Sequence, residues 1–387
     1  MRRSAASCSR WRRGGRPRRR CNERRSLPGP VRHRLGKRHL QRLRPQHRRN
    51  LRRARRRACS AARRRRTGSA CPRAGPGAGR ARVSALRLPA TLQVFERGWL
   101  SANNVLLVDG EEATLIDSGY LSHAPQTVAL VGSALGGRRL DRLINTHSHS
   151  DHIGGNAALQ RAFGCAICVP AGMAPAVERW DEAALLLSTA GQAGERFRHD
   201  AVLAAGDSFV AGELAWQALA APGHDMDALA FYNPERRLLI SGDALWRDGF
   251  GILFAEVLGT DDGLGATRRT LEAIGRLAVD VVIPGHGAPF ADFDDAMARA
   301  HARLRAFEAD GARMARNAIR ACVAFDLLAR RRLELDELPR LLAETPLYRE
   351  ADRRFLGLGA EALADWLVGE LERAGLARRE GGALLAV

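Results

Sequence analysis

The charge distribution divides the chain into two segments that cannot fold in the same way. Residues 1–90 carry 32 Lys and Arg side chains and one acidic side chain, Glu23, for a net charge of +31. Their apolar residues stand singly between arginine runs such as Arg63–Arg66. Like-charge repulsion and a low apolar content prevent such a segment from forming a core, so we expect residues 1–88 to be a disordered arm. The remaining 297 residues carry a net charge of −11 and must contain the folded protein.

The arm has three interpretations. It is a nucleic-acid-binding tail that acts by counterion release, an Arg-rich and acid-poor transit peptide, or a segment that is not made in the native protein. We favour the third, because Lys37 is the only lysine of the chain and such an Arg and Ala bias is typical of very GC-rich coding DNA. Translation would then start near Val83 or Leu86. The intact mass of the natively expressed protein tests this, and a mass that includes residues 1–80 would contradict it.

Hydropathy and cysteine content indicate a soluble protein in a reducing compartment. No apolar stretch reaches the length of a signal peptide core or of a membrane span of about 18 residues. The seven cysteines are an odd number. Cys165 and Cys168 form a CxxC, but they lie in a short apolar run that is typical of a buried strand, and no second pair completes a zinc site. We therefore expect a cytoplasmic protein with no membrane partner.

From about residue 91, short β-type runs alternate with helical segments. The predicted strands lie at residues 91–99, 103–109, 113–119, 140–147, 201–206, 214–221, 228–233, 237–243 and 280–286, and the predicted helices at 123–135, 156–163 and 266–277. Strands that feed helices, together with hairpin-like pairs, indicate a layered α/β sandwich. We expect one large domain at residues 89–300.

The last part of the chain is mainly helical. Apolar residues at helical spacing predict one continuous amphipathic helix over residues 292–330. Two short helices follow, and then a two-strand tip with Gly381 and Gly382 at its turn. This order is typical of a winged helix, so we expect residues 301–387 to form a small helical, winged-helix-like domain.

The densest polar cluster stands at the end of an apolar strand, in the segment Thr146–His152. It holds three of the eight histidines of residues 91–387, together with Asp151. Alternate residues of a strand point the same way, so His147 and His149 can converge on one ion. The turn that follows can aim Asp151 and His152 at a neighbouring point.

Three further candidate ligands follow other strands. His224 stands in APGHD, Asp243 in SGDALW and His286 in PGHG, each beside a glycine that lets a loop approach a metal closely. Five histidines and two aspartates suffice for two divalent metal ions that share one carboxylate. Mixed imidazole and carboxylate ligands suit zinc best, with iron and manganese as alternatives.

The motif THSHSDHIGG, with the contexts of the later candidates, resembles the metallo-β-lactamase superfamily over residues 91–300. The resemblance implies a four-layer αββα sandwich and these roles: His147, His149 and His224 for the first metal, Asp151, His152 and His286 for the second, Asp243 as the bridge, and Asp117 as the acid that orients the histidine loop. An aspartate at the bridging position is similar to the glyoxalase II and ribonuclease Z branch rather than to the penicillin-degrading enzymes.

The resemblance also implies a binuclear hydrolase that acts through a metal-bridging hydroxide, which Asp151 can orient and whose proton it can pass on. We expect a small acyl substrate, a thioester or a lactone, against an apolar wall formed by Trp246, Phe250 and Phe254, with Tyr120 or Trp180 opposite. The segment PGHGAPF lacks the acidic-aromatic pair of glyoxalase II, and residues 91–387 contain no lysine to bind the carboxylates of glutathione. These departures argue against glutathione thioesters.

The alternative function is that of an endoribonuclease with an appended winged helix. Residues 91–300 carry a net charge of −12 and residues 301–387 one of +1, whereas a phosphate-backbone binder needs a basic patch. We therefore do not expect a nucleic-acid partner for the folded part. The C-terminal domain would instead pack on the catalytic domain or build a homodimer. A non-catalytic metal-bound sensor is a third reading, which the complete ligand set argues against.

Overall fold

The structure is a computed structural model that describes residues 86–387. The predicted disordered arm therefore lies outside the described residues, apart from its last three positions. None of the helices in residues 86–387 combines the length and the hydropathy that crossing a membrane requires.

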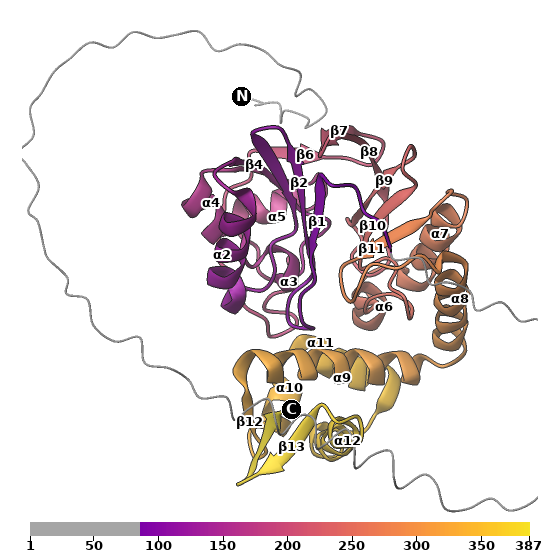
Figure 1. The fold of residues 1–387 in the computed structure, drawn as a ribbon. Coiled ribbons are helices and arrows are strands. Elements are labelled where there is room, and N and C mark those ends of the chain that lie inside the picture. The colour runs from indigo at the N-terminus through magenta and orange to yellow at the C-terminus, as the bar shows by residue number, and fades with distance from the viewer. Residues whose placement is uncertain (1–85) are drawn as a thin grey trace, which may run out of the picture. The chain divides into compact units, whose positions relative to one another are not determined.

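The first sheet has six strands in chain order. They are β1 (Leu92–Phe95), β2 (Asn104–Asp109), β3 (Glu112–Ile116), β4 (Arg139–Ile144), β5 (Ala166–Pro170) and β6 (Ala201–Leu203). The first three pair antiparallel, and β3 to β6 pair in parallel. Parallel neighbours need crossover connections, and α2 (Ala124–Leu135) and α4 (Asn156–Phe163) supply two of them. Figure 1 shows both helices, with α5 (Ala174–Arg179), on the outer face of this sheet.

The second sheet has five strands in the order β11-β10-β9-β8-β7. They are β7 (Ser208–Ala211), β8 (Leu214–Ala220), β9 (Leu229–Asn233), β10 (Leu238–Gly242) and β11 (Val281–Pro284). Strand β7 is absent from the sequence prediction; it forms a hairpin with β8 across Gly212 and Glu213, both with φ of 62°. Helices α7 (Gly263–Ile274) and α8 (Phe293–Ala309) lie on the outer side, and α6 (Phe254–Leu258) lies below the strands in Figure 1.

The two sheets pack face to face around a shared core. Trp216, Phe231 and Ile283 of the second sheet meet Leu107 and Ile144 of the first. Because helices cover both outer faces, the layers run helix, sheet, sheet, helix. The predicted four-layer αββα sandwich is confirmed.

The prediction of one continuous helix over residues 292–330 is wrong. The helix is interrupted at Asp310, between α8 and α9 (Gly311–Arg330). Asp310 has φ of −145° and ψ of 90°, and its side chain accepts a hydrogen bond from the backbone N–H of Arg313 at 2.9 Å, which caps α9. Phe307 and Met314, on either side of the break, are seven residues apart and both buried, so the apolar spacing alone did not reveal it.

The chain after α9 forms a small α/β unit. Its elements are β12 (Arg332–Glu334), α10 (Leu338–Glu344), α11 (Pro346–Ala351), η3 (Asp352–Leu356), α12 (Ala360–Arg373), β13 (Ala377–Glu380) and β14 (Ala383–Ala386). Strands β13 and β14 pair across Gly381 and Gly382, both with positive φ, so the predicted two-strand tip is confirmed, and β12 adds a third strand. The winged-helix assignment and the domain boundary at residue 300, which falls inside α8, stay predictions.

Candidate metal centre

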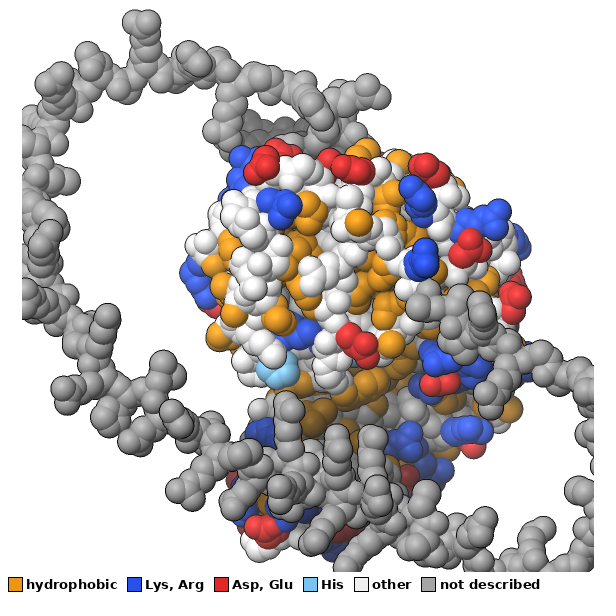
Figure 2. All heavy atoms as spheres, in the orientation of Figure 1, with side chains coloured by type: hydrophobic (Ala, Val, Ile, Leu, Met, Phe, Trp, Pro, Cys, Tyr) orange, Lys and Arg blue, Asp and Glu red, His pale blue; other side chains and the backbone are white. Residues whose placement is uncertain are grey.

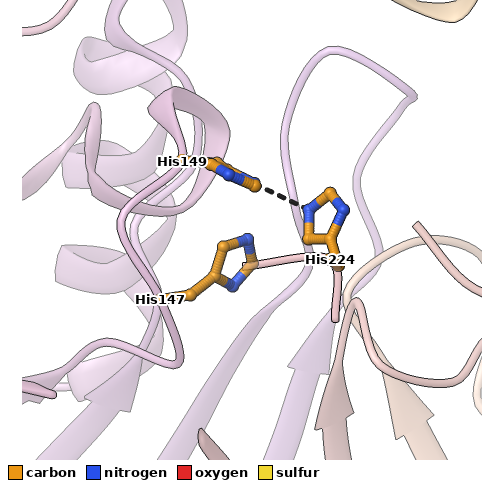
Figure 3. Close-up of side chains that lie close together, drawn as sticks. All are labelled: His147, His149 and His224. Atoms are coloured by element: carbon orange, nitrogen blue, oxygen red, sulfur yellow. Dashed lines mark hydrogen bonds between the residues drawn. The ribbon is translucent and has the colours of Figure 1, made fainter. Parts of the chain in front are cut away.

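The predicted ligands lie in loops that follow strands of both sheets. Strand β4 leads through Asn145 and Thr146 into the histidine segment and the short helix α3 (Ser150–Ile153). Strand β10 ends directly before Asp243, and β11 ends two residues before His286. Figure 3 shows His147, His149 and His224 converging from separate parts of the chain.

All seven predicted ligands come together in one cluster. Their ligand atoms form three groups, and within each group the atoms lie within 4.8 Å of one another. The groups are His147, His149 and His224; His147, His152 and Asp243; and Asp151, His152 and His286. The second group shares one residue with each of the others. Asp243 Oδ2 lies 3.3 Å from His224 Nε2 and 3.7 Å from His286 Nε2, so this carboxylate stands between the two outer groups.

Asp117, the predicted orienting acid, lies directly behind the histidine loop. Its Oδ1 accepts a hydrogen bond from the backbone N–H of Thr146 at 2.9 Å, and its Oδ2 accepts one from the Thr146 hydroxyl at 2.8 Å. The same Oδ2 lies 2.8 Å from His152 Nδ1. A carboxylate oxygen only accepts, so His152 Nδ1 donates this hydrogen bond and Nε2 is the nitrogen that faces the cluster.

Two more imidazole rings are oriented by hydrogen bonds outside the cluster. The Thr146 hydroxyl already donates to Asp117, so it accepts a hydrogen bond from His147 Nδ1, which lies 3.0 Å away. His224 Nδ1 donates to the carbonyl of Ile252 at 2.6 Å. Both rings therefore present a lone pair on Nε2. His149 Nδ1 lies 2.7 Å from that His224 Nε2, the contact that Figure 3 marks with a dashed line.

Three imidazole nitrogens of the cluster have no hydrogen-bond partner. Within residues 86–387, the buried side-chain nitrogen and oxygen atoms without one are His147 Nε2, His149 Nε2, His152 Nε2 and Arg303 Nε. Burying a polar atom without a partner is costly, and imidazole nitrogens are common ligands of zinc and other transition metals. The donor set therefore fits divalent metal ions.

Burial keeps several of the imidazoles neutral. It lowers the pKa of His147 well below the ordinary value, with the nearby imidazoles His152, His149 and His224 adding to the effect. Burial likewise lowers the pKa of His149 to about 3 and also lowers that of His224. Neutral rings keep their lone pairs at physiological pH, which is the form that binds a cation.

Asp117, Asp151 and Asp243 concentrate negative charge around His152. Burial opposes ionisation of Asp243, but His286 and His152 hold its pKa well below the ordinary value. Burial also opposes protonation of His152, yet Asp117 and the other cluster carboxylates raise its pKa well above the ordinary value. This end of the cluster thus stabilises a positive charge.

Two glycines allow the ligand loops to approach this closely. A Cβ atom at Gly285 would lie 2.0 Å from Asp243 Oδ1, and one at Gly251 would lie 2.3 Å from His224 Nδ1. Any larger residue at either position would displace a candidate ligand.

A small cavity of about 50 Å³ adjoins the cluster. Five candidate ligands and seven other side chains line it: His149, Asp151, His224, Asp243, His286, Trp99, Gln192, Ile252, Phe254, Ala321, Cys322 and Phe325. The last three come from α9, which runs along the lower edge of the sandwich in Figure 1. Figure 2 shows hydrophobic side chains gathered in the recess between this helix and the sandwich.

Two of the predicted substrate contacts reach the cluster: Trp246, and Phe254, which lines the cavity with its ring 4.7 Å from that of His149. The Trp246 ring lies 5.3 Å from that of His286, and its Nε1 donates to Asp243 Oδ1 at 3.1 Å. Phe250 is buried against Phe307, and Tyr120 packs edge-on against Phe325; neither lines the cavity. Trp180 instead packs edge-on against Phe197. The chain after Trp246 folds back on itself through a bridge to Gly249, which turns Phe250 toward α8 and away from the cluster.

Several side chains at the cavity were not predicted from the sequence. Trp99, 42% exposed, has its ring 4.9 Å from that of His286. The sequence prediction placed it in a strand, whereas β1 ends at Phe95. The glycine before it, Gly98, is the sequence feature that could have indicated the end of the strand. Gln192 and the α9 residues lie far from the motif in sequence, and no local pattern marks them.

Comparisons with known proteins agree with this geometry. Residues 97–286 match the family model of the metallo-beta-lactamase superfamily. The hydroxyacylglutathione hydrolase of Methylococcus capsulatus is 33% identical over 121 residues, which are 30% of this chain and 39% of the relative. That of Rhodospirillum rubrum is 29% identical over 165 residues, which are 43% of this chain and 56% of the relative. The matches thus span about two-fifths to just over half of these relatives' lengths.

Among solved structures, a metallo-beta-lactamase family protein from Thermus thermophilus is 21% identical. The match has a TM-score of 0.46 and covers 78% of this chain and 100% of that one.

Proposed function

Because residues 97–286 belong to the metallo-beta-lactamase superfamily, we propose that the chain is a binuclear metal-dependent hydrolase of a small acyl compound, a thioester or a lactone. The observation that carries the proposal is the set of three partnerless Nε2 atoms, which meet Asp243 in one buried cluster. Such a set is stable when cations occupy it.

Each residue has a distinct part in this proposal. His147, His149 and His224 would hold the first ion, Asp151, His152 and His286 the second, and Asp243 would contact both. Divalent ions bound there would supply Lewis-acid polarisation of a carbonyl oxygen and a coordinated water of lowered pKa. The mixed imidazole and carboxylate set favours zinc, with iron and manganese as alternatives.

Asp151 is positioned to take up the proton of the attacking water. Its Oδ2 lies 2.9 Å from His286 Nε2, so these two atoms would share the second ion, and Oδ1 would remain to accept a proton. Nearby imidazoles, His152 first among them, keep the Asp151 pKa low although burial opposes this. Asp151 therefore stays ionised at neutral pH, the form that a general base needs. Asp117 would not contact the ions; it accepts a hydrogen bond from His152 Nδ1 and so orients that ring.

The cavity favours a small and uncharged acyl group. Its walls include Trp99, Ile252, Phe254 and Phe325, and no arginine or lysine is among its lining residues. The curated relatives are named for a thioester of glutathione, which supports the thioester class. The absence of a basic side chain in the lining argues against recognition of the glutathione carboxylates at this position.

The test is a substrate panel with the purified full chain and two equivalents of zinc. The panel holds acyl thioesters, lactones, a chromogenic cephalosporin and single-stranded RNA. We expect turnover of a thioester or a lactone, with the rate lost in His147→Ala and kept in His301→Ala, which alters a histidine on α8 that takes no part in the cluster. Turnover of RNA alone would overturn the proposal.

A further inference from the structure

A second unusual polar group lies outside the metal cluster. Apart from the three imidazoles, Arg303 Nε is the buried side-chain nitrogen within residues 86–387 that lacks a hydrogen-bond partner. Burial, together with the nearby charges of Arg320 and Arg313, lowers the pKa of this guanidinium to about 10. A cation that is partly buried and faces other cations needs a counter-charge.

Packing fixes the position of Arg303. A Cβ atom at Gly249, where φ is 132°, would lie 2.6 Å from Arg303 Cδ, so the aliphatic part of the side chain rests directly on this glycine. The guanidinium carbon lies 4.9 Å from the ring centre of Phe307 and 5.4 Å from that of Phe250. Aromatic faces attract a cation but carry no net charge. The arginine is therefore held in place without being neutralised.

Arg303 opens onto a cavity of about 750 Å³ between α8, α9 and α12. Arg313, Arg316 and Arg320, one helical turn apart on α9, line the same cavity. Figure 2 shows arginine side chains at the lower right of the molecule, in the region where Figure 1 places α8 and α9. The volume lies within the range of about 300–1,000 Å³ that is typical of small-molecule sites. This cavity shares no lining residue with the one at the metal cluster.

The carboxylates of this cavity already have partners. Asp248 pairs with Arg299 at 3.4 Å, and Glu370 contacts Arg320 at 3.7 Å. Asp310 caps α9. Within the described part of the chain, Arg303, Arg313 and Arg316 have no carboxylate oxygen within 4.0 Å, so three guanidinium groups face the cavity unpaired.

We propose that this cavity binds the phosphate group of a small phosphate-bearing molecule, with Arg303 at its base and Arg313 and Arg316 at its mouth. Guanidinium groups match the oxygens of phosphate with paired N–H donors, and a buried arginine binds an anion more strongly than an exposed one. The site is independent of the proposed hydrolysis.

The experiment is calorimetric titration of the metal-loaded full chain at fixed ionic strength, with inorganic phosphate in one arm and phenyl phosphate in the other. We expect saturable binding of at least one of them. Arg303→Met keeps the apolar stem on Gly249 and removes the charge, and it should weaken binding by at least about tenfold, the effect of losing one charge-assisted contact. Arg305→Met, an exposed arginine of α8 outside the cavity, is the matched control and should bind as the wild type does.

A second variant keeps the test decisive if Arg303→Met does not fold. Arg313→Gln together with Arg316→Gln changes two exposed side chains and should also weaken binding by at least about tenfold. Phosphate held by the metal cluster would not respond to these substitutions. Failure of both ligands to bind, or affinity unchanged in the variants that fold, would overturn the proposal.

Discussion

Each of three histidines in the metal cluster is held by a hydrogen bond on the ring nitrogen that faces away from it. Asp117, the Thr146 hydroxyl and the Ile252 carbonyl accept these bonds. The sequence could identify the seven candidate ligands, because they stand at strand ends, and His224, Asp243 and His286 also adjoin a glycine. It could not show which ring nitrogen faces the cluster, because the Ile252 carbonyl is brought there only by the fold.

Asp117→Asn isolates the role of the orienting acid. Asparagine tolerates the left-handed backbone at this position, where φ is 57°, so the fold should persist. An amide is a weaker acceptor and carries no charge, so the His152 ring loses its fixed orientation. We expect metal affinity or activity to fall by about 10- to 100-fold, measured by competition with a chelator and by initial rates.

The control for this substitution is Asp109→Asn, at the exposed end of β2. It should leave metal affinity and rate unchanged. Full metal affinity and rate in Asp117→Asn would show that this acid does not orient His152.

Helix α9 lines the cavity at the metal cluster, and its first residue follows the break that ends α8. Its apolar residues were predicted correctly as one face, but the break at Asp310 was not. The break depends on a side-chain cap, which is compatible with a continuous apolar spacing. The direction of the loop after Asp243 could not be predicted either. Phe250 lies close to this candidate ligand in sequence, but the turn at Gly249 directs its side chain into the core.

Asp310→Ala removes the cap of α9. We expect the free energy of unfolding to fall by about 0.5–2 kcal/mol, because the backbone N–H of Arg313 loses its acceptor. Urea unfolding followed by circular dichroism measures this change. Asp365→Ala, an exposed aspartate inside α12, should shift the midpoint far less. Equal shifts in the two variants would contradict the capping role.

The second sheet and the C-terminal helices share one hydrophobic core. A single cluster of buried residues runs from Leu239 of β10 through α9 to Leu371 of α12. The backbone N–H of Leu347, in α11, also donates to the carbonyl of Thr189 at 3.0 Å. The two parts that the sequence predicted as separate domains thus stabilise one another. Periodicity predicted which faces are apolar, but not which faces meet, because those contacts join residues far apart in the chain.

Leu347→Ala tests this shared core. Leu347 is fully buried, so we expect a loss of about 2–5 kcal/mol in the free energy of unfolding, within a single transition that tryptophan fluorescence and circular dichroism report together. Leu358→Ala, at a position 39% exposed, is the control and should change stability little. Two separate transitions, of which the substitution shifts only one, would contradict a shared core.

We propose that seven side chains hold two divalent ions, with Asp243 between them. The decisive measurement is the metal content per chain, determined by mass spectrometry on wild-type protein and on Asp243→Ala after the same zinc loading and desalting. We predict two ions per chain in the wild type, and at most one, with most of the hydrolytic rate lost, in Asp243→Ala. Two ions and an undiminished rate in Asp243→Ala would contradict this proposal.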